Sequence, residues 1–185
     1  DKTGTLTRGE FRVVEITTRP GMSQDDALAL AAAVERDSEH TIAQGVVRSA
    51  EQRNLSIPPA EQFQAIPGKG VQARVEGRQI LIGGPALLRT VNASTPPELE
   101  AAIERATERG QAAITMLEDA SPIAVFAVAD AIREESQEAV QRLHEQDVEV
   151  IMMTGDAKPV AHSVAKQLGI DVVFAEVSPD QKASK

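Results

Sequence analysis

The C-terminal third of the chain has the pattern of a parallel α/β unit, and this feature restricts the possible folds more than any other in the sequence. Residues 148–153 are almost continuously apolar, which is typical of a buried strand in a parallel sheet. We expect a helix over 160–168, which Gly169 ends, and a second strand over 172–174. A strand, a helix and another strand in succession predict a right-handed parallel unit. A helix over 134–146 precedes this unit, with acidic residues at its start, where the helix dipole favours them.

The middle of the chain follows a different pattern, because apolar and polar residues alternate there with a period of two. Such alternation indicates antiparallel strands with one face against a core. Ser23, followed three residues later by Asp26, indicates the start of a helix. The elements that we expect here are strands over 10–18, within 62–75, over 79–82, 112–117 and 123–129, and helices through 27–34, 42–53 and 97–109, with a further helix starting at Pro85.

These patterns predict an α/β protein with two domains. Residues 1–8 and 129–185 are expected to form a doubly wound parallel α/β domain, which is incomplete because the strand that should lead into Asp1 is missing. Residues 9–128 are expected to form an α+β insert, in which helical hairpins flank an antiparallel sheet. We expect hinges where the chain crosses between the two domains, near Gly9 and Ala129.

Composition excludes several classes of protein. The 185 residues contain 19 Lys and Arg against 28 Asp and Glu, and the resulting net charge of −9 argues against general nucleic-acid binding. The chain has no cysteine, so it has neither disulfides nor thiolate metal ligands. No apolar run approaches the ~20 residues that span a bilayer.

The first residues are suited to phosphoryl chemistry. The Asp1 carboxylate is a possible nucleophile, and Lys2, Thr3 and the backbone N–H groups around Gly4 can hold phosphate oxygens. A loop after a strand is the ordinary alternative.

Two further segments of the predicted α/β domain have similar chemistry. Thr154, Gly155 and Asp156 follow the strand over 148–153, where a hydroxyl and a backbone N–H can bind a phosphoryl oxygen. Lys182 could neutralise phosphoryl charge. The alternatives are an Asp-containing turn, which is common in α/β proteins, and an exposed lysine.

A second group of candidates lies in the predicted insert. Glu39 and His40 could bind a purine, because an imidazole stacks on such a ring and a carboxylate accepts from an exocyclic amine. The alternative for His40 is a helix cap. Gly68 and Gly70 would let the backbone pass close to a ligand, and Gly83 with Gly84 ends the next hairpin.

Together these segments resemble the heavy-metal-transporting P-type ATPases, whose motifs they follow in order across nearly the whole chain. The matching segments are Asp1-Lys2-Thr3-Gly4-Thr5-Leu6-Thr7, Ser38-Glu39-His40, Gly68-Lys69-Gly70, Gly83-Gly84, Asp130 with Arg133, Thr154-Gly155-Asp156, and Pro179 with Lys182. Four positions in three segments depart from the family pattern. Thr41-Ile42 replaces Pro-Leu, Gly84 replaces Asn, and Ala157 replaces Asn. The segment Phe174-Ala175-Glu176-Val177 favours the copper-like branch.

The resemblance implies a nucleotide-binding domain inserted in a phosphorylation domain of haloacid-dehalogenase-like fold. ATP would bind with its adenine near Glu39 and His40, between the two glycine turns, and Asp130 and Arg133 would reach the nucleotide from the second crossing. The γ-phosphate would pass to Asp1. Mg²⁺ would bridge the phosphoryl group and the Asp1 carboxylate, with the Thr3 carbonyl as a further ligand.

The resemblance also implies partners outside the chain. The parent would be an integral membrane protein with this region on the cytoplasmic side. Its membrane and actuator domains would be partners, and the chain itself would not bind the transported metal ion. The chain alone is expected to bind adenine nucleotide weakly without turnover, because the family's Gly-Asp-Gly motif would lie beyond Lys185.

Two alternatives remain open from the residues. One is a nucleotide-binding module without phosphoryl chemistry. The other is a phosphatase of the same α/β superfamily. Related phosphatases have a second Asp two residues after the nucleophile as general acid and base, whereas Thr3 occupies that position here. This difference favours the ATPase.

Overall fold

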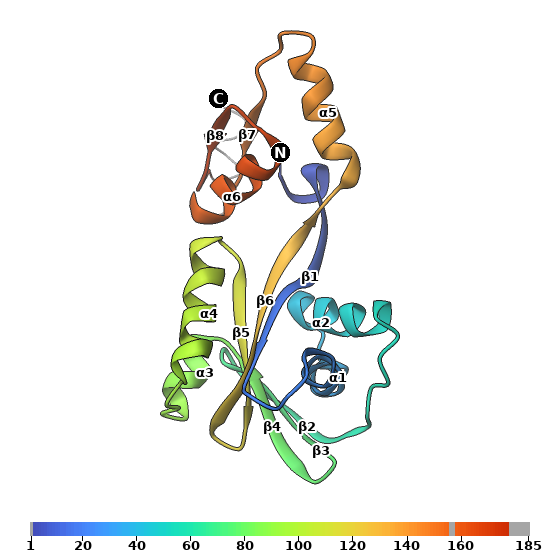
Figure 1. Ribbon diagram of the computed structural model, residues 1–185, viewed down its shortest axis with the longest axis vertical. Coiled ribbons are helices and arrows are strands. Elements are labelled where there is room, and N and C mark those ends of the chain that lie inside the picture. The colour runs from blue at the N-terminus through green and yellow to red at the C-terminus, as the bar shows by residue number, and fades with distance from the viewer. Residues whose placement is uncertain (1, 156–157, 178–185) are drawn as a thin grey trace. The chain divides into compact units, whose positions relative to one another are not determined.

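The computed structural model describes residues 2–155 and 158–177, and the chain divides into two compact units (Figure 1). We call residues 11–106 and 112–129 the antiparallel unit, and residues 1–10, 107–111 and 130–185 the α/β unit. The described elements are, in chain order, η1 (Lys2–Leu6), β1 (Thr7–Thr18), α1 (Gln24–Glu35), α2 (Thr41–Gln52), β2 (Ala60–Ile66), β3 (Gly70–Val75), β4 (Arg78–Gly83), α3 (Pro85–Thr90), α4 (Pro97–Glu108), β5 (Ala112–Glu118), β6 (Ser121–Ile132), α5 (Glu134–His144), β7 (Ile151–Met153), α6 (Lys158–Leu168) and β8 (Val172–Phe174).

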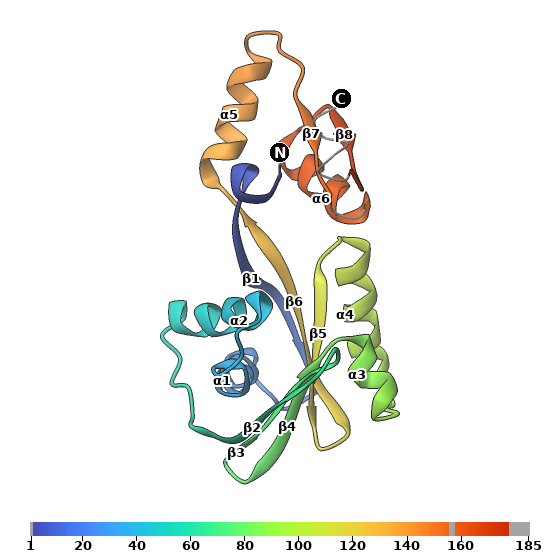
Figure 2. The same ribbon diagram turned by 180° about the vertical axis from the view of Figure 1, so that it is seen from behind.

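The antiparallel unit is built on a six-stranded sheet with the strand order β1-β6-β5-β4-β3-β2. From β2 to β6 each pair of neighbours is antiparallel. Helices α1 and α2 cover one face of the sheet, and α3 and α4 cover the other (Figures 1 and 2). The predicted insert, an antiparallel sheet flanked by two pairs of helices, is therefore confirmed.

Alternation along the strands explains why both faces of this sheet are covered. On β4, Ile80 and Ile82 belong to the large core that also contains residues of α1 and α2. Leu81, which points the other way, packs with Leu87 of α3 in a separate cluster. Apolar side chains on both sides require a helical layer on each face.

The start of α1 follows the sequence prediction. The Ser23 hydroxyl accepts a hydrogen bond from the Asp26 backbone N–H at 3.0 Å, so Ser23 is the N-cap. A capping side chain of this kind satisfies one of the backbone donors that a helix leaves free in its first turn.

The α/β unit contains the expected parallel pair. β7 and β8 are parallel neighbours, and α6 connects them. Met152 of β7 packs in one core with Val140 of α5 and with Val164 and Leu168 of α6. Leu6 of η1 also packs against this core, so η1 is anchored to the same unit as β7.

β7 is shorter than the strand expected over 148–153, because the side chain of Asp171 replaces part of the ladder. The Val150 backbone N–H donates to the Asp171 carboxylate at 2.8 Å, while the Val150 carbonyl accepts from the Asp171 and Val172 backbone N–H groups at 3.2 and 3.3 Å. Val148 is exposed. The ordered ladder therefore begins at Ile151.

Within the described ranges, no helix combines the length and the apolar character needed to traverse a bilayer.

Candidate functional site

The antiparallel unit contains a cavity of about 630 Å³, which we call the glycine-turn cavity. Segments far apart in the sequence form it: the end of α1 with the start of α2, the β2–β3 turn, the end of β4 with the start of α3, and the start of β5. Its volume lies in the range of small-molecule sites, and most of its lining is apolar side chains and glycine. Five predicted site residues line it: His40, Gly68, Gly70, Gly83 and Gly84.

His40 has two roles in the structure. It is the N-cap of α2, because its Nδ1 accepts a hydrogen bond from the Ile42 backbone N–H at 3.2 Å. An accepting Nδ1 has no proton, so the neutral ring has its proton on Nε2. The same side chain lines the cavity. The sequence left helix cap and ligand-binding residue as alternative roles for His40. In this conformation one side chain can fill both roles.

Glu35 is the acidic residue in the lining of the glycine-turn cavity. It is the last residue of α1 and is only 7% exposed. Burial raises the pKa of Glu35 to about 7, and a hydrogen bond with the Ser38 side chain opposes this shift in part. A carboxyl group that titrates near neutral pH in a concave site is typical of functional positions.

Glu35 is not among the predicted site residues, although the sequence contains a signal for it. Leu28, Ala31 and Ala32 of α1 are buried, and Glu35 follows them at helical spacing. An acidic residue on such an apolar stripe is unusual, since an isolated buried carboxylate is costly. The apolar run over 27–34 was used only to predict a helix, which ended one residue before Glu35.

The two glycine turns approach each other so closely that two of their positions have no room for a side chain. A Cβ on Gly70 would lie 2.0 Å from the Ile82 carbonyl oxygen, and a Cβ on Gly83 would lie 2.2 Å from the Lys69 carbonyl oxygen. Gly70 also has a φ of +154°, which L-residues rarely adopt. Side chains at Gly70 and Gly83 would therefore force β3 and β4 apart, which explains glycine there. Gly84 has open space and a φ of −88°, so its geometry does not require glycine.

Three other predicted residues lie elsewhere. Glu39 is exposed and is not part of the cavity lining. Asp130 and Arg133 belong to the α/β unit. Arg133 donates from Nε to the Thr7 carbonyl and from Nη2 to the Gly4 carbonyl, both at 3.2 Å. The described contacts of Arg133 therefore hold the N-terminal segment.

The N-terminal segment forms η1, a single π-helical turn, before β1 begins. The Thr7 hydroxyl donates to Asp130 Oδ2 at 2.5 Å, and the buried Lys2 ammonium lies 3.8 Å from the same oxygen. Lys2 and Thr7 thus connect the start of the chain to the end of β6.

Thr154 and Gly155 lie directly after β7, as expected. Thr154 is buried, and its backbone joins two neighbours: its N–H donates to the Phe174 carbonyl at 2.9 Å, and its carbonyl accepts from the Val177 N–H at 3.0 Å. Gly155 is exposed. Asp1, Asp156 and Lys182, and the side chain of Thr3, lie outside the described part of the chain.

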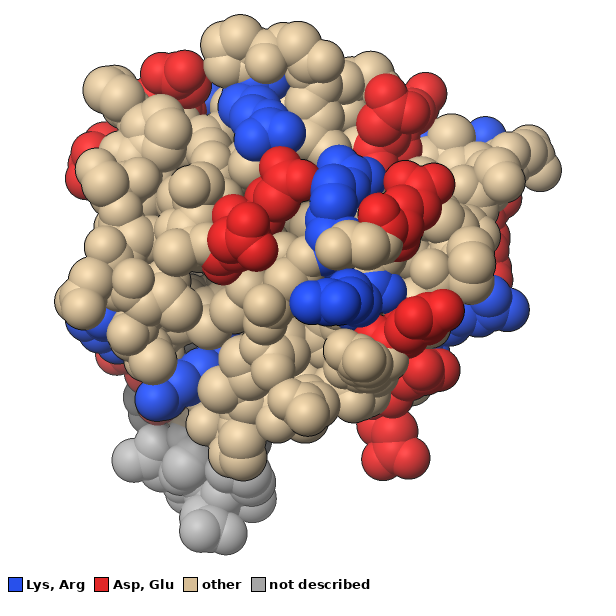
Figure 3. Space-filling view, turned by 90° about the horizontal axis from the view of Figure 1, so that it is seen from below, with Lys and Arg blue, Asp and Glu red and all other residues tan. Residues whose placement is uncertain are grey.

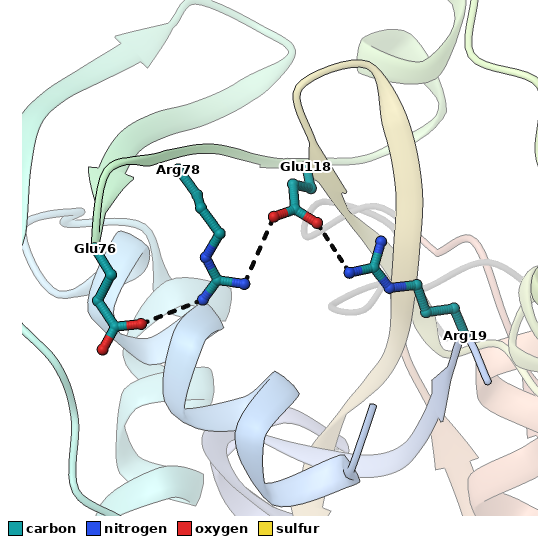
Figure 4. Close-up of polar contacts among 4 residues, drawn as sticks. All are labelled: Arg19, Glu76, Arg78 and Glu118. Carbon is teal, nitrogen blue, oxygen red and sulfur yellow. Dashed lines mark hydrogen bonds and ion pairs between the residues drawn. The ribbon is translucent and has the colours of Figure 1, made fainter. Parts of the chain in front are cut away.

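The antiparallel unit has a second cavity of about 590 Å³, whose lining includes Arg19, Glu76 and Arg78 but none of the predicted site residues. Its arginines are already paired (Figure 4). Glu118 accepts from Arg19 at 2.9 Å and contacts Arg78 at 3.6 Å, and Arg78 also contacts Glu76 at 3.4 Å. Basic and acidic side chains are mixed on the face that Figure 3 shows. We therefore place the candidate site in the glycine-turn cavity.

No group of three or more His, Cys, Asp or Glu side chains within residues 2–155 and 158–177 could hold a metal ion. A Mg²⁺ site in this chain would therefore need ligands such as the Asp1 carboxylate, backbone carbonyls or substrate phosphates, which are oxygen ligands that this hard cation prefers.

A model of the haloacid dehalogenase-like hydrolase family matches residues 1–184. The whole chain is 40% identical to part of the Probable copper-exporting P-type ATPase V of Mycobacterium tuberculosis, of which it covers 24%. It is also 40% identical to part of the Copper-exporting P-type ATPase B of Archaeoglobus fulgidus, of which it covers 26%. The chain thus spans about a quarter of the length of these relatives.

Among solved structures, a zinc-transporting PIB-type ATPase in an E2.Pi state superimposes on the whole chain with a TM-score of 0.89 and 32% sequence identity. The chain covers 29% of that structure. The likeness therefore extends over both compact units.

Proposed function

Because the chain belongs to the haloacid dehalogenase-like hydrolases and is homologous to the nucleotide-binding and phosphorylation region of PIB-type ATPases, we propose that it binds ATP and is phosphorylated on Asp1 in a metal-transporting pump. The antiparallel unit would be the nucleotide-binding domain, and the α/β unit would be the phosphorylation domain. The observation that supports this best is the gathering of five predicted residues around the glycine-turn cavity.

The cavity is chemically suited to adenine. Its apolar and glycine surfaces can bury a planar ring, and the imidazole of His40 can stack on such a ring. The ionised Glu35 carboxylate can accept a hydrogen bond from the exocyclic amine. Glu39, which was expected to do this, does not line the cavity, whereas Glu35 does, so we assign that role to Glu35.

The phosphoryl step would use residues of the α/β unit. A carboxylate oxygen of Asp1 attacks the γ-phosphorus, the bond from phosphorus to the bridging oxygen breaks, and ADP leaves with that oxygen. Lys2, Thr154, Gly155 and Lys182 would hold the transferred group and offset its charge. Mg²⁺ held by the Asp1 carboxylate and the Thr3 carbonyl would neutralise developing charge.

Thr3 supports an ATPase in preference to a phosphatase. A hydroxyl two residues after the nucleophile is a poor general base, so water would attack the aspartyl phosphate slowly. A long-lived acylphosphate allows a pump to couple hydrolysis to conformational change. The membrane and actuator domains of the full-length chain are the proposed partners, and this region would lie on the cytoplasmic side of the membrane.

The transported ion is proposed to be a metal cation, with copper favoured. Both relatives at 40% identity are described as copper-exporting, whereas the structural neighbour is described as zinc-transporting. The ion would bind in the membrane domain, outside this chain.

Replacing His40 tests the adenine site. We expect His40→Ala to lower the free energy of unfolding by about 1 kcal/mol, because it removes the cap of α2. It should also weaken ATP binding about tenfold, through loss of the stacked ring. Thermal unfolding and calorimetric titration with ATP measure the two effects.

His40→Asn is the matched control, since asparagine is a good N-cap but has no ring to stack. We expect it to restore the stability and leave the affinity reduced. If His40→Asn bound ATP as tightly as the unchanged chain, His40 would be a cap only.

A further inference from the structure

The β2–β3 turn places a lysine at the glycine-turn cavity. Lys69 is the basic side chain among the described residues that line it, and it is exposed. Its side chain makes no ion pair or hydrogen bond with any residue in the described part of the chain. The arginines of the second cavity, in contrast, are bound to Glu76 and Glu118.

The backbone of this lysine is held from both sides. The Lys69 N–H donates to the Ile66 carbonyl at 2.9 Å, which closes the turn. The Lys69 carbonyl packs so closely against Gly83 that a Cβ there would lie 2.2 Å from it. The Cα of Lys69 is therefore fixed at the cavity, and its flexible side chain can reach a ligand there.

The charged residues of the lining favour one orientation of a ligand whose two ends differ in charge. Glu35 is 7% exposed and would repel a polyanion when it is ionised. Lys69 is exposed and would attract one. A ligand with an uncharged planar end and a polyanionic end therefore has one favourable orientation, with the uncharged end toward Glu35 and the anionic end toward Lys69.

We infer that the ammonium group of Lys69 binds the phosphate chain of the nucleotide and makes the cavity select nucleotides by their number of phosphates. This inference rests on the proposed function, because it assumes that a nucleotide occupies the cavity. An ammonium is a point charge whose attraction grows with the charge of the phosphate chain. ATP should therefore bind more tightly than ADP, and ADP more tightly than AMP.

Calorimetric titrations of the chain with ATP, ADP, AMP and adenosine test the inference. For Lys69→Met, we expect ATP affinity to fall about fivefold while adenosine affinity stays unchanged. High salt should reduce the preference of the unchanged chain for ATP, since both charges are near solvent. Lys166→Met, the same substitution at an exposed lysine of α6, is the control and should bind all four ligands normally.

The outcomes separate this inference from the proposed function. If Lys69→Met lowered the affinities for ATP and adenosine equally, the lysine would only support the turn. If the ATP affinity were unchanged, the lysine would not contact the phosphate chain. Either result overturns the inference while leaving nucleotide binding intact. If the unchanged chain bound none of the four ligands, the proposed function would fail with it.

Discussion

Glu35→Gln is expected to change the free energy of unfolding about 3 kcal/mol more favourably at pH 8 than at pH 4. The structure holds Glu35 in a site that raises the pKa of its carboxyl from 4.5 to about 7. Because the folded chain binds this proton more tightly than the unfolded chain, the carboxyl contributes stability that is fully present below pH 4.5. That contribution is lost as the pH rises through 7, where a buried charge must form.

Urea unfolding at a series of pH values measures this effect. The curves of the unchanged chain and Glu35→Gln should diverge between pH 4.5 and 7, because the amide does not ionise. Glu51→Gln, at an exposed position on α2, controls for the change in net charge. If the two curves of unfolding free energy against pH ran parallel, the Glu35 carboxyl would be well solvated. The cavity would then have no buried carboxyl group with a raised pKa.

The second large effect is expected for Asp1→Asn in the complete protein. An amide is a poor nucleophile, so phosphorylation by ATP should fall at least about a thousandfold. Acid-stable incorporation of ³²P from labelled ATP, followed by release with hydroxylamine, measures the aspartyl phosphate. Adenine binding in the glycine-turn cavity should persist, because the residues proposed to contact the adenine lie in the antiparallel unit.

Asp147→Asn provides the comparison for this experiment, since it makes the same chemical change at an exposed position after α5. It should retain full phosphorylation. A hydroxylamine-labile phosphate that persisted in Asp1→Asn would place the acceptor on another residue, and the proposed mechanism would have to be abandoned.

Much of the fold could be predicted from local pattern. The alternation along β3 and β4 and the cap at Ser23 depend on neighbours in the sequence, and the structure confirms the elements that they indicate. The parallel pair β7 and β8 followed from strand, helix and strand in succession. Boundaries were less accurate, because the contact between Asp171 and Val150 that shortens β7 joins residues far apart in the sequence.

The site could be predicted only in part. The glycines of the two turns and His40 were predicted from the chemistry of their residue types and from their place in motifs that resemble those of the heavy-metal-transporting P-type ATPases. Glu35 was not predicted, because its role depends on burial at the end of α1. The apolar run before it indicates a helix but does not show that the next residue is buried. The closeness of Gly83 to the Lys69 carbonyl arises from the pairing of β3 with β4, which single residues do not reveal.

Glycine amide signals report whether adenine nucleotide binds in the glycine-turn cavity. In a ¹⁵N-labelled chain titrated with ATP, we expect shifts of the amide signals of Gly68, Gly70, Gly83 and Gly84, which line that cavity. Gly21, which lines the second cavity, should not move. Shifts at Gly21 with unchanged signals at the other four glycines would instead place the nucleotide in the second cavity.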